Sequence, residues 1–185
     1  MRVFLCTAPS ANSAALPDSK VWLNNLHRGL TTAGAEVVLP SFDTHRYMEE
    51  CLGHVAGVAP QHARALYSEL LWHDVQLVHQ GQGLDLFLAY VWNIHLLPET
   101  VHRIRGLGIP TVLFYCNAAH QFHRVAAIAP HFDVCMVPER QALAKYESVG
   151  AHPVHIQMAA DPHMYRREAG PLLYDVTFVG QRYLN

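Results

Sequence analysis

The sequence has few charged residues and no excess of basic ones. Only 15% of its 185 residues are charged, and 13 Lys and Arg residues stand against 15 Asp and Glu. Binding along a nucleic acid needs a basic stripe that follows the phosphates, and no Lys/Arg run in this chain would form one. We therefore expect no nucleic-acid partner.

Long hydrophobic runs are also missing. The longest, Leu86–Trp92, is far shorter than the roughly 20 residues with which a helix crosses a membrane. The chain becomes polar directly after Met1–Cys6, too early for the core of a signal peptide, so this stretch is interpreted as a first strand. We expect a cytoplasmic protein without a membrane span.

Several sequence fingerprints of catalysis and cofactor binding are absent. The four cysteines form no CxxC pair, and the chain has no GxGxxG, P-loop, HExxH or GxSxG motif. His120 and His123 have the spacing of two metal ligands, but no third ligand accompanies them at a diagnostic distance. We predict buried, reduced thiols, no bound metal and no tightly held cofactor.

The sequence does contain enough apolar residues for a core, and they occur in a repeated order of helix, glycine and strand. Hydrophobic residues make up 51% of the chain. Helical stretches end near a glycine, as at Gly34, Gly83, Gly108 and Gly150, and a short apolar strand follows within a few residues. Glycine closes a helix in the left-handed conformation at least cost. Such repeated units predict an α/β, Rossmann-like open parallel sheet with helices on both faces.

The predicted strands are short, mostly continuous apolar runs, as expected where both faces of a sheet are covered. They lie near residues 2–6, 36–39, 85–90, 110–116, 133–137 and 154–157. Helices are predicted near residues 20–33, 60–80, 98–106, 120–128 and 138–149.

The domain prediction divides the chain near residue 165. Residues 1–165 form one Rossmann-like domain, and residues 166–173, with Gly170 and Pro171, are interpreted as a linker. Residues 174–180 then form a further apolar strand. Two interpretations stay open: the first strand of a C-terminal domain that this chain lacks, or a terminal edge strand of the first sheet. An exposed strand of this kind could also join two copies as a homodimer.

Ligands of open α/β sheets bind at the carboxyl ends of the strands, and this rule selects candidate loops. The loop after the first strand offers Ser10, Asn12 and Ser13, small polar residues that let backbone approach a ligand. The alternative is an ordinary surface loop. The loop after the third strand contains Trp92, Asn93 and His95, which suit a sugar or a planar ring. For Trp92 the alternative is packing in the core.

Two further candidates follow later strands. Asn117 and His120 lie where the fourth strand meets a helix, and a helix start favours a neutral imidazole that acts as a base. Asn117 could instead cap that helix. Asp161 precedes Pro162 after the last strand, where it is a turn former or an acid of the site.

An ordered set of segments between Asp85 and Gly180 resembles one enzyme family. These segments are Asp85–Leu88, Gly108–His120, Phe132–Pro138, Lys145–Ala151, Met158–Pro162 and Tyr174–Gly180. In this order they resemble the N-terminal half of CgeB-type, or spore-maturation-protein-like, glycosyltransferases of the GT-B group. The first eighty residues agree with that family only in their β/α layout.

The resemblance implies two Rossmann-like domains that face each other across a cleft. The C-terminal domain would bind most of the nucleotide-sugar donor, and this domain would offer the acceptor surface and the base, without a metal. His120 and Asp161 match the family best, whereas the family often has acidic residues where this chain has Asn117 and Ala118.

The sequence therefore leads to two expectations of different class. The first is the acceptor-side domain of a nucleotide-sugar-dependent glycosyltransferase, with His120 as catalytic base and no activity without its C-terminal partner domain. Its substrates would be a sugar acceptor and a nucleotide sugar. The second is a stand-alone flavodoxin-like module that binds a ligand or a partner without catalysis.

Overall fold

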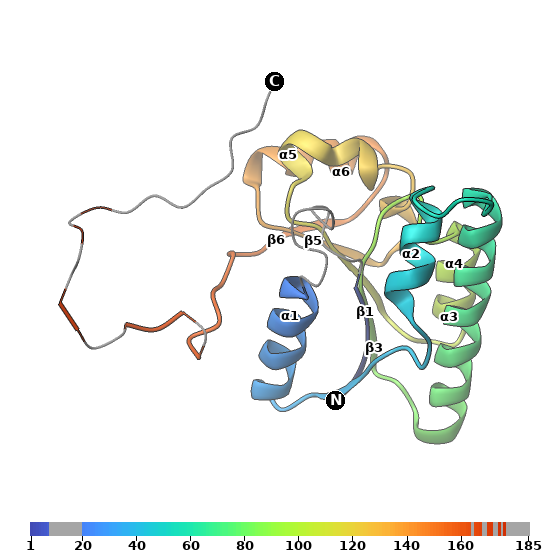
Figure 1. Ribbon diagram of the computed structural model, residues 1–185, viewed down its shortest axis with the longest axis horizontal. Helices are drawn as coiled ribbons and strands as arrows, with labels where there is room; N and C mark the ends of the chain where they lie inside the picture. The colour runs from blue at the N-terminus through green and yellow to red at the C-terminus, as the bar shows by residue number, and fades with distance from the viewer. Residues whose placement is uncertain (8–19, 164, 168–169, 172–173, 175, 177–185) are drawn as a thin grey trace.

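Six parallel strands form one sheet in the order β2-β1-β3-β4-β5-β6. The computed structural model describes residues 1–7, 20–163, 165–167, 170–171, 174 and 176 (Figure 1). The strands are β1 (Arg2–Thr7), β2 (Glu36–Val38), β3 (Leu86–Tyr90), β4 (Thr111–Phe114), β5 (Val134–Val137) and β6 (Pro153–His155). The predicted all-parallel α/β sheet is confirmed, and each of its strands lies within a few residues of its predicted place.

The helices connect these strands. They are α1 (Val21–Thr32), α2 (Thr44–Cys51), α3 (Pro60–Gln82), α4 (Pro98–Gly106), α5 (Ala118–Gln121) and α6 (Leu143–Ser148), with short 3-10 turns η1 (Phe122–Arg124), η2 (Ala129–His131) and η3 (Arg140–Ala142). Proline occupies the first turn of α3 and α4. A backbone N–H at this position has no partner within the helix, so proline, which lacks it, costs no hydrogen bond there.

The helices divide unequally between the two faces of the sheet. The connection from β1 to β2 runs toward one edge, and the step from β2 to β3 returns past β1 toward the other. Right-handed crossovers in opposite directions place their helices on opposite faces. Figure 1 accordingly shows α1 on one side of the strands and α2, α3 and α4 on the other.

The core lies between the sheet and α3 and α4. β1 has four consecutive fully buried residues, which fits a strand covered on both faces. Phe87 stacks between Phe4, at 6.0 Å between ring centroids, and Phe132, at 6.4 Å. Tyr67 of α3 reaches β1, where its hydroxyl lies 2.8 Å from Cys6 Sγ.

The prediction of reduced thiols is confirmed for all four cysteines, and that of burial for three of them. Each cysteine is a free thiol, three of them are buried, and Cys116 is half-buried. Burial raises the pKa of the Cys6 thiol and that of Cys135 to about 12, so both stay protonated at neutral pH. These cysteines act as small apolar core residues.

The structure differs from the prediction in two helical regions. The helix α2 was not predicted, although Asp43 caps it by accepting the Arg46 N–H at 3.1 Å. Its eight residues include only three buried ones, so its apolar pattern is too short to detect. The helix predicted near 120–128 is instead the short α5 followed by η1, because the chain turns there to meet the loop after β3.

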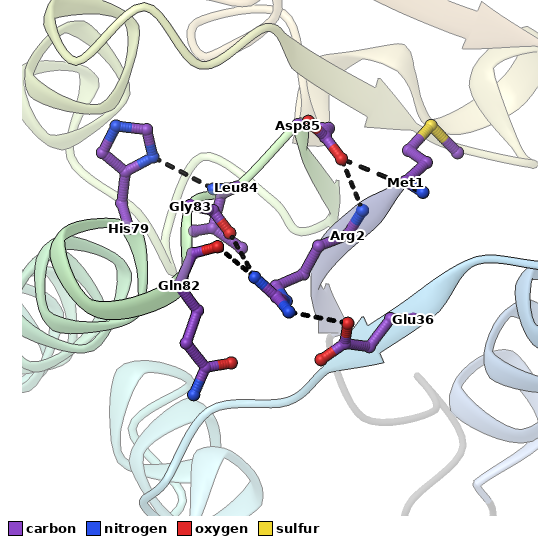
Figure 2. Close-up of polar contacts among 8 residues, drawn as sticks. All are labelled: Met1, Arg2, Glu36, His79, Gln82, Gly83, Leu84 and Asp85. Atoms are coloured by element: carbon purple, nitrogen blue, oxygen red, sulfur yellow. Dashed lines mark hydrogen bonds and ion pairs between the residues drawn. The ribbon is translucent and has the colours of Figure 1, made fainter.

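A polar network closes the amino-terminal ends of β1, β2 and β3 (Figure 2). The Arg2 guanidinium donates to Glu36 Oε2 at 2.8 Å and to the carbonyls of Gln82 and Gly83. The Arg2 backbone N–H donates to Asp85 Oδ2 at 2.6 Å. The hydrogen bond from Arg2 lowers the pKa of the Glu36 carboxyl. This end of the sheet is occupied by its own side chains, which leaves the carboxyl ends for ligands.

The predicted linker and the strand at 174–180 lie mostly outside the described residues. Tyr174 and Val176, which are described, are both exposed. Among the residues that the structure describes, no helix combines the length and apolar character needed to cross a membrane.

Candidate functional site at the carboxyl edge of the sheet

The strand order places a topological switch point between β1 and β3. The chain leaves β1 toward β2 on one side, while β3, β4, β5 and β6 follow one another on the other side. Loops that diverge from such a point leave a crevice at the carboxyl ends of the strands, where open α/β sheets bind ligands. The loop after β3 begins at this point.

Trp92 and His95 form a stacked pair just beyond β3. Their ring centroids are 4.9 Å apart and their planes differ by 25°. The turn that holds them is closed by the His95 N–H, which donates to the Trp92 carbonyl at 3.0 Å. Trp92 is 4% exposed and His95 is fully buried. The structure thus brings these two predicted residues together inside the fold.

The hydrogen bonds of His95 fix its tautomer. Its Nδ1 accepts the Trp92 backbone N–H at 3.2 Å, so the proton of the neutral ring lies on Nε2. Burial, together with the charges of Arg64 and Arg124, lowers the pKa of His95 to about 3. His95 is therefore a neutral N–H donor at physiological pH.

Two buried donors of this pair have no acceptor. His95 Nε2 and Trp92 Nε1 are both inaccessible to solvent, and neither has a hydrogen-bond partner among the described residues. Buried polar atoms in folded proteins nearly always have a partner, so such exceptions need an explanation. Water or a ligand that offers an acceptor would satisfy them.

Two arginines converge on the same imidazole. Arg124, in η1, places its guanidinium carbon 4.6 Å from the centroid of the Trp92 ring. Arg64, near the start of α3, donates to the Leu96 carbonyl at 2.8 Å, next to His95. Both positive charges lower the pKa of His95. Sequence reasoning missed both arginines, because α3 and η1 lie far apart along the chain.

Asn93 connects the loop after β3 to the loop after β4. Its Oδ1 accepts the N–H groups of Ala127 and Ile128 at 3.1 and 3.0 Å, and its Nδ2 donates to the His123 carbonyl at 2.7 Å. Its backbone N–H donates to the Arg124 carbonyl at 2.7 Å. The side chain is thus engaged within the protein, where it positions Arg124. A direct role of Asn93 in ligand binding stays a prediction.

We expect Asn93→Ala to lower the free energy of unfolding by about 1–3 kcal/mol, because two N–H groups and one carbonyl lose a partner. Asn93→Asp keeps the acceptor for Ala127 and Ile128 but sets a carboxylate oxygen against the His123 carbonyl, so it should also be less stable than wild type. Urea unfolding measures both variants. Equal stability of Asn93→Ala and wild type would contradict this account.

The buried imidazole also predicts how stability depends on pH. The folded-state pKa of His95 is about 3, below the unfolded value of about 6.5, so the unfolded chain binds more protons between these values. The stability that the neutral His95 contributes is fully present above pH 6.5, and it is lost progressively as the pH falls toward 3. At pH 5 the loss amounts to about 2 kcal/mol.

The matched variant for this pH dependence is His95→Gln, which does not titrate. Denaturant unfolding of wild type and variant between pH 4 and 8 gives the difference attributable to His95. Stability should fall less steeply for the variant on acidification. Parallel curves would show that His95 is not the group responsible.

Asn117 and His120 lie on the next loop, at α5. Both side chains are exposed, and His120 has no hydrogen-bond partner among the described residues. Asn117 occupies the N-cap position of α5, but its side chain makes no capping hydrogen bond. Glu139, from the loop after β5, instead accepts the Ala119 N–H with its Oε2 at 2.6 Å. Sequence reasoning missed Glu139, which supplies a carboxylate beside His120 from a different strand.

Asp161 lies away from this edge, against α1. Its Oδ2 accepts from Arg28 Nη1 at 2.9 Å, and its Oδ1 accepts the His163 N–H at 2.9 Å. The second hydrogen bond, to a residue two positions further on, is the one that a turn-forming aspartate makes, which was one of the two roles that the sequence suggested for Asp161. The side chain is only 7% exposed, so this carboxylate is held by the protein itself.

Asp161 also lines an apolar groove on the α1 face of the sheet. The groove has a volume of about 670 Å³ and includes Leu88, Phe114 and Met136 in its floor. It exists because the remaining crossovers place their helices on the opposite face, which leaves α1 to cover this one. His120 is not part of its lining, so the two residues that best match the resemblance do not share this cavity.

The remaining predicted residues, Ser10, Asn12 and Ser13, lie outside the described residues. Within the described part of the chain, no group of three or more His, Cys, Asp or Glu side chains could hold a metal ion. No protein-family model matches the chain, and no curated protein matches it either.

Proposed function

We propose that this chain is the acceptor-side domain of a nucleotide-sugar-dependent glycosyltransferase. The observation that carries the proposal is the exposed, unpartnered imidazole of His120 at the carboxyl edge of an all-parallel sheet. A catalytic base has to reach its substrate from solvent, and this edge is where such sheets bind their substrates. The ordered resemblance of residues 85–180 to CgeB-type enzymes supports the same function.

The proposed reaction needs one proton acceptor from this domain. His120 accepts the proton of an acceptor hydroxyl, or amine, as its oxygen or nitrogen bonds to the anomeric carbon of the donor. The bond from that carbon to the diphosphate breaks, and its electron pair leaves with the nucleoside diphosphate. Asn117, exposed beside His120, offers an amide to orient the acceptor. The donor would bind chiefly to a second domain.

One observation favours a second candidate. The order β2-β1-β3-β4-β5 is the strand order of flavodoxin-like proteins, here extended by β6. A flavin or another planar ligand at the switch point would then be bound without catalysis. This candidate does not need His120.

A transfer assay on the product of the complete reading frame tests the first proposal. We expect acceptor-dependent release of nucleoside diphosphate from one member of a nucleotide-sugar panel, and no release from residues 1–185 alone. Sugar acceptors should still bind residues 1–185 and shift the NMR signals of His120. Flavin absorbance in the purified protein, with no transfer, would favour the second candidate.

A further inference from the structure

Arg64 and Arg124 differ from most other arginines among the described residues in their lack of a carboxylate partner. Five arginines each have a carboxylate oxygen within 4.0 Å, namely Arg2, Arg28, Arg46, Arg103 and Arg105. Neither Arg64 nor Arg124 forms an ion pair with a described residue. Both are half-buried, so their positive charges are partly removed from water without a negative partner.

Arg103 and Arg124 form a matched pair that makes this difference plain. Each lies over a tryptophan ring, Arg103 at 4.3 Å from the centroid of Trp72 and Arg124 at 4.6 Å from that of Trp92. Arg103 also donates to Glu69 Oε1 at 2.5 Å. Arg124 has the ring and no carboxylate. The same stacking geometry therefore leaves the donors of Arg124 available to an external acceptor.

The groups around these arginines are donors as well. The Nε2–H of His95 and the Nε1–H of Trp92 are buried without an acceptor. Two positive charges thus contact the segment 92–96 that carries the two unsatisfied N–H groups. This segment follows β3, which borders the switch point of the sheet, where ligands bind. The chemistry that complements such a set is a multiply charged oxyanion.

We propose that Arg64 and Arg124 bind a phosphate group of a ligand beside the segment that follows β3, with Trp92 holding the Arg124 side chain in place. A phosphate monoester carries about −1.5 to −2 charges at neutral pH, which balances two guanidinium groups, whereas one carboxylate would leave a positive charge uncompensated. Asn93 is a positioning residue for this site, because it fixes the backbone of Arg124. The inference does not rest on sugar transfer.

The test uses inorganic phosphate and pyrophosphate as probes, at constant ionic strength, on residues 1–185. We expect both to shift the ¹⁵N–¹H signal of the Trp92 indole and the Nε2 signal of His95 along a saturable curve. Arg124→Gln should weaken pyrophosphate binding about tenfold or more. The matched control Arg103→Gln should bind like wild type. Arg124→Lys keeps the charge without the planar fork, and serves if the glutamine variant does not fold.

The competing outcomes are distinct. Glucuronate, a sugar carboxylate, should bind more weakly than pyrophosphate, and tighter binding of glucuronate would overturn the assignment to phosphate. Absence of a saturable shift with either probe, or equal binding by wild type and Arg124→Gln, would overturn the site itself. Saturable phosphate binding without any sugar transfer would contradict the proposed transferase and leave the phosphate site standing. Sugar transfer without phosphate binding would contradict the phosphate site and leave the transferase standing.

Discussion

His120→Ala lowers kcat by about 100- to 10,000-fold in the transferase that we propose, because a positioned general base contributes that much. The imidazole is exposed at α5 and has no partner among the described residues, so its removal leaves the fold intact. The measurement is release of nucleoside diphosphate by the product of the complete reading frame. The melting temperature should stay close to that of wild type.

The matched control for this prediction is His123→Ala. His123 is an exposed histidine three residues further along, and it takes part in the fold through its backbone carbonyl, which the substitution keeps. We expect it to retain normal turnover. Normal turnover by His120→Ala would remove His120 as the base, and an equal loss in both variants would point to damage of the loop.

The second large effect concerns stability, in the aromatic stack at the centre of the sheet. Phe87→Ala should lower the free energy of unfolding by about 3–5 kcal/mol, since it removes a fully buried ring between Phe4 and Phe132 and leaves a cavity. Because β3 borders the switch point, loosening it should also broaden the NMR signals of Trp92 and His95. Urea unfolding gives the change in free energy.

Two controls separate the cavity from other effects of the substitution. Phe87→Leu keeps most of the apolar volume and should cost clearly less than the alanine variant. Leu66→Ala, at a position on α3 that is 49% exposed, should change stability by about 0.5 kcal/mol or less. If Phe87→Ala lost no more than Leu66→Ala, the stack would not be a main source of stability.

Most of the fold could be predicted from local sequence. Apolar runs such as 86–90 and the glycines at 34, 108 and 150 mark strands and helix ends, and all three glycines have positive φ angles. These signals lie within a few residues of the element that they define. The helix α2 was not predicted because it is only eight residues long and has three buried residues, so its periodicity carried little information.

Less of the candidate site could be predicted. The rule for parallel sheets selected the loop after β3, and Trp92 and His95 of that loop do stack on each other; that ligands bind at this edge stays a prediction. The rule could not tell that Asn93 is used within the protein, or that Asp161 pairs with Arg28 on another face. Such pairings depend on which loops meet, and no local pattern records them.

By itself, then, the sequence determined a parallel α/β sheet, because strand and helix formation follow from short-range patterns of apolar residues and glycine. Only the tertiary structure decided that Arg64 and Arg124 both contact the segment that carries the buried imidazole of His95. The first comes from α3 and the second from η1, and the strand order with its right-handed crossovers places both beside the end of β3. Among the described residues, the carboxylates of Glu36, Asp161, Glu50, Glu69 and Asp133 pair with other arginines, and this too is a property of the packed chain.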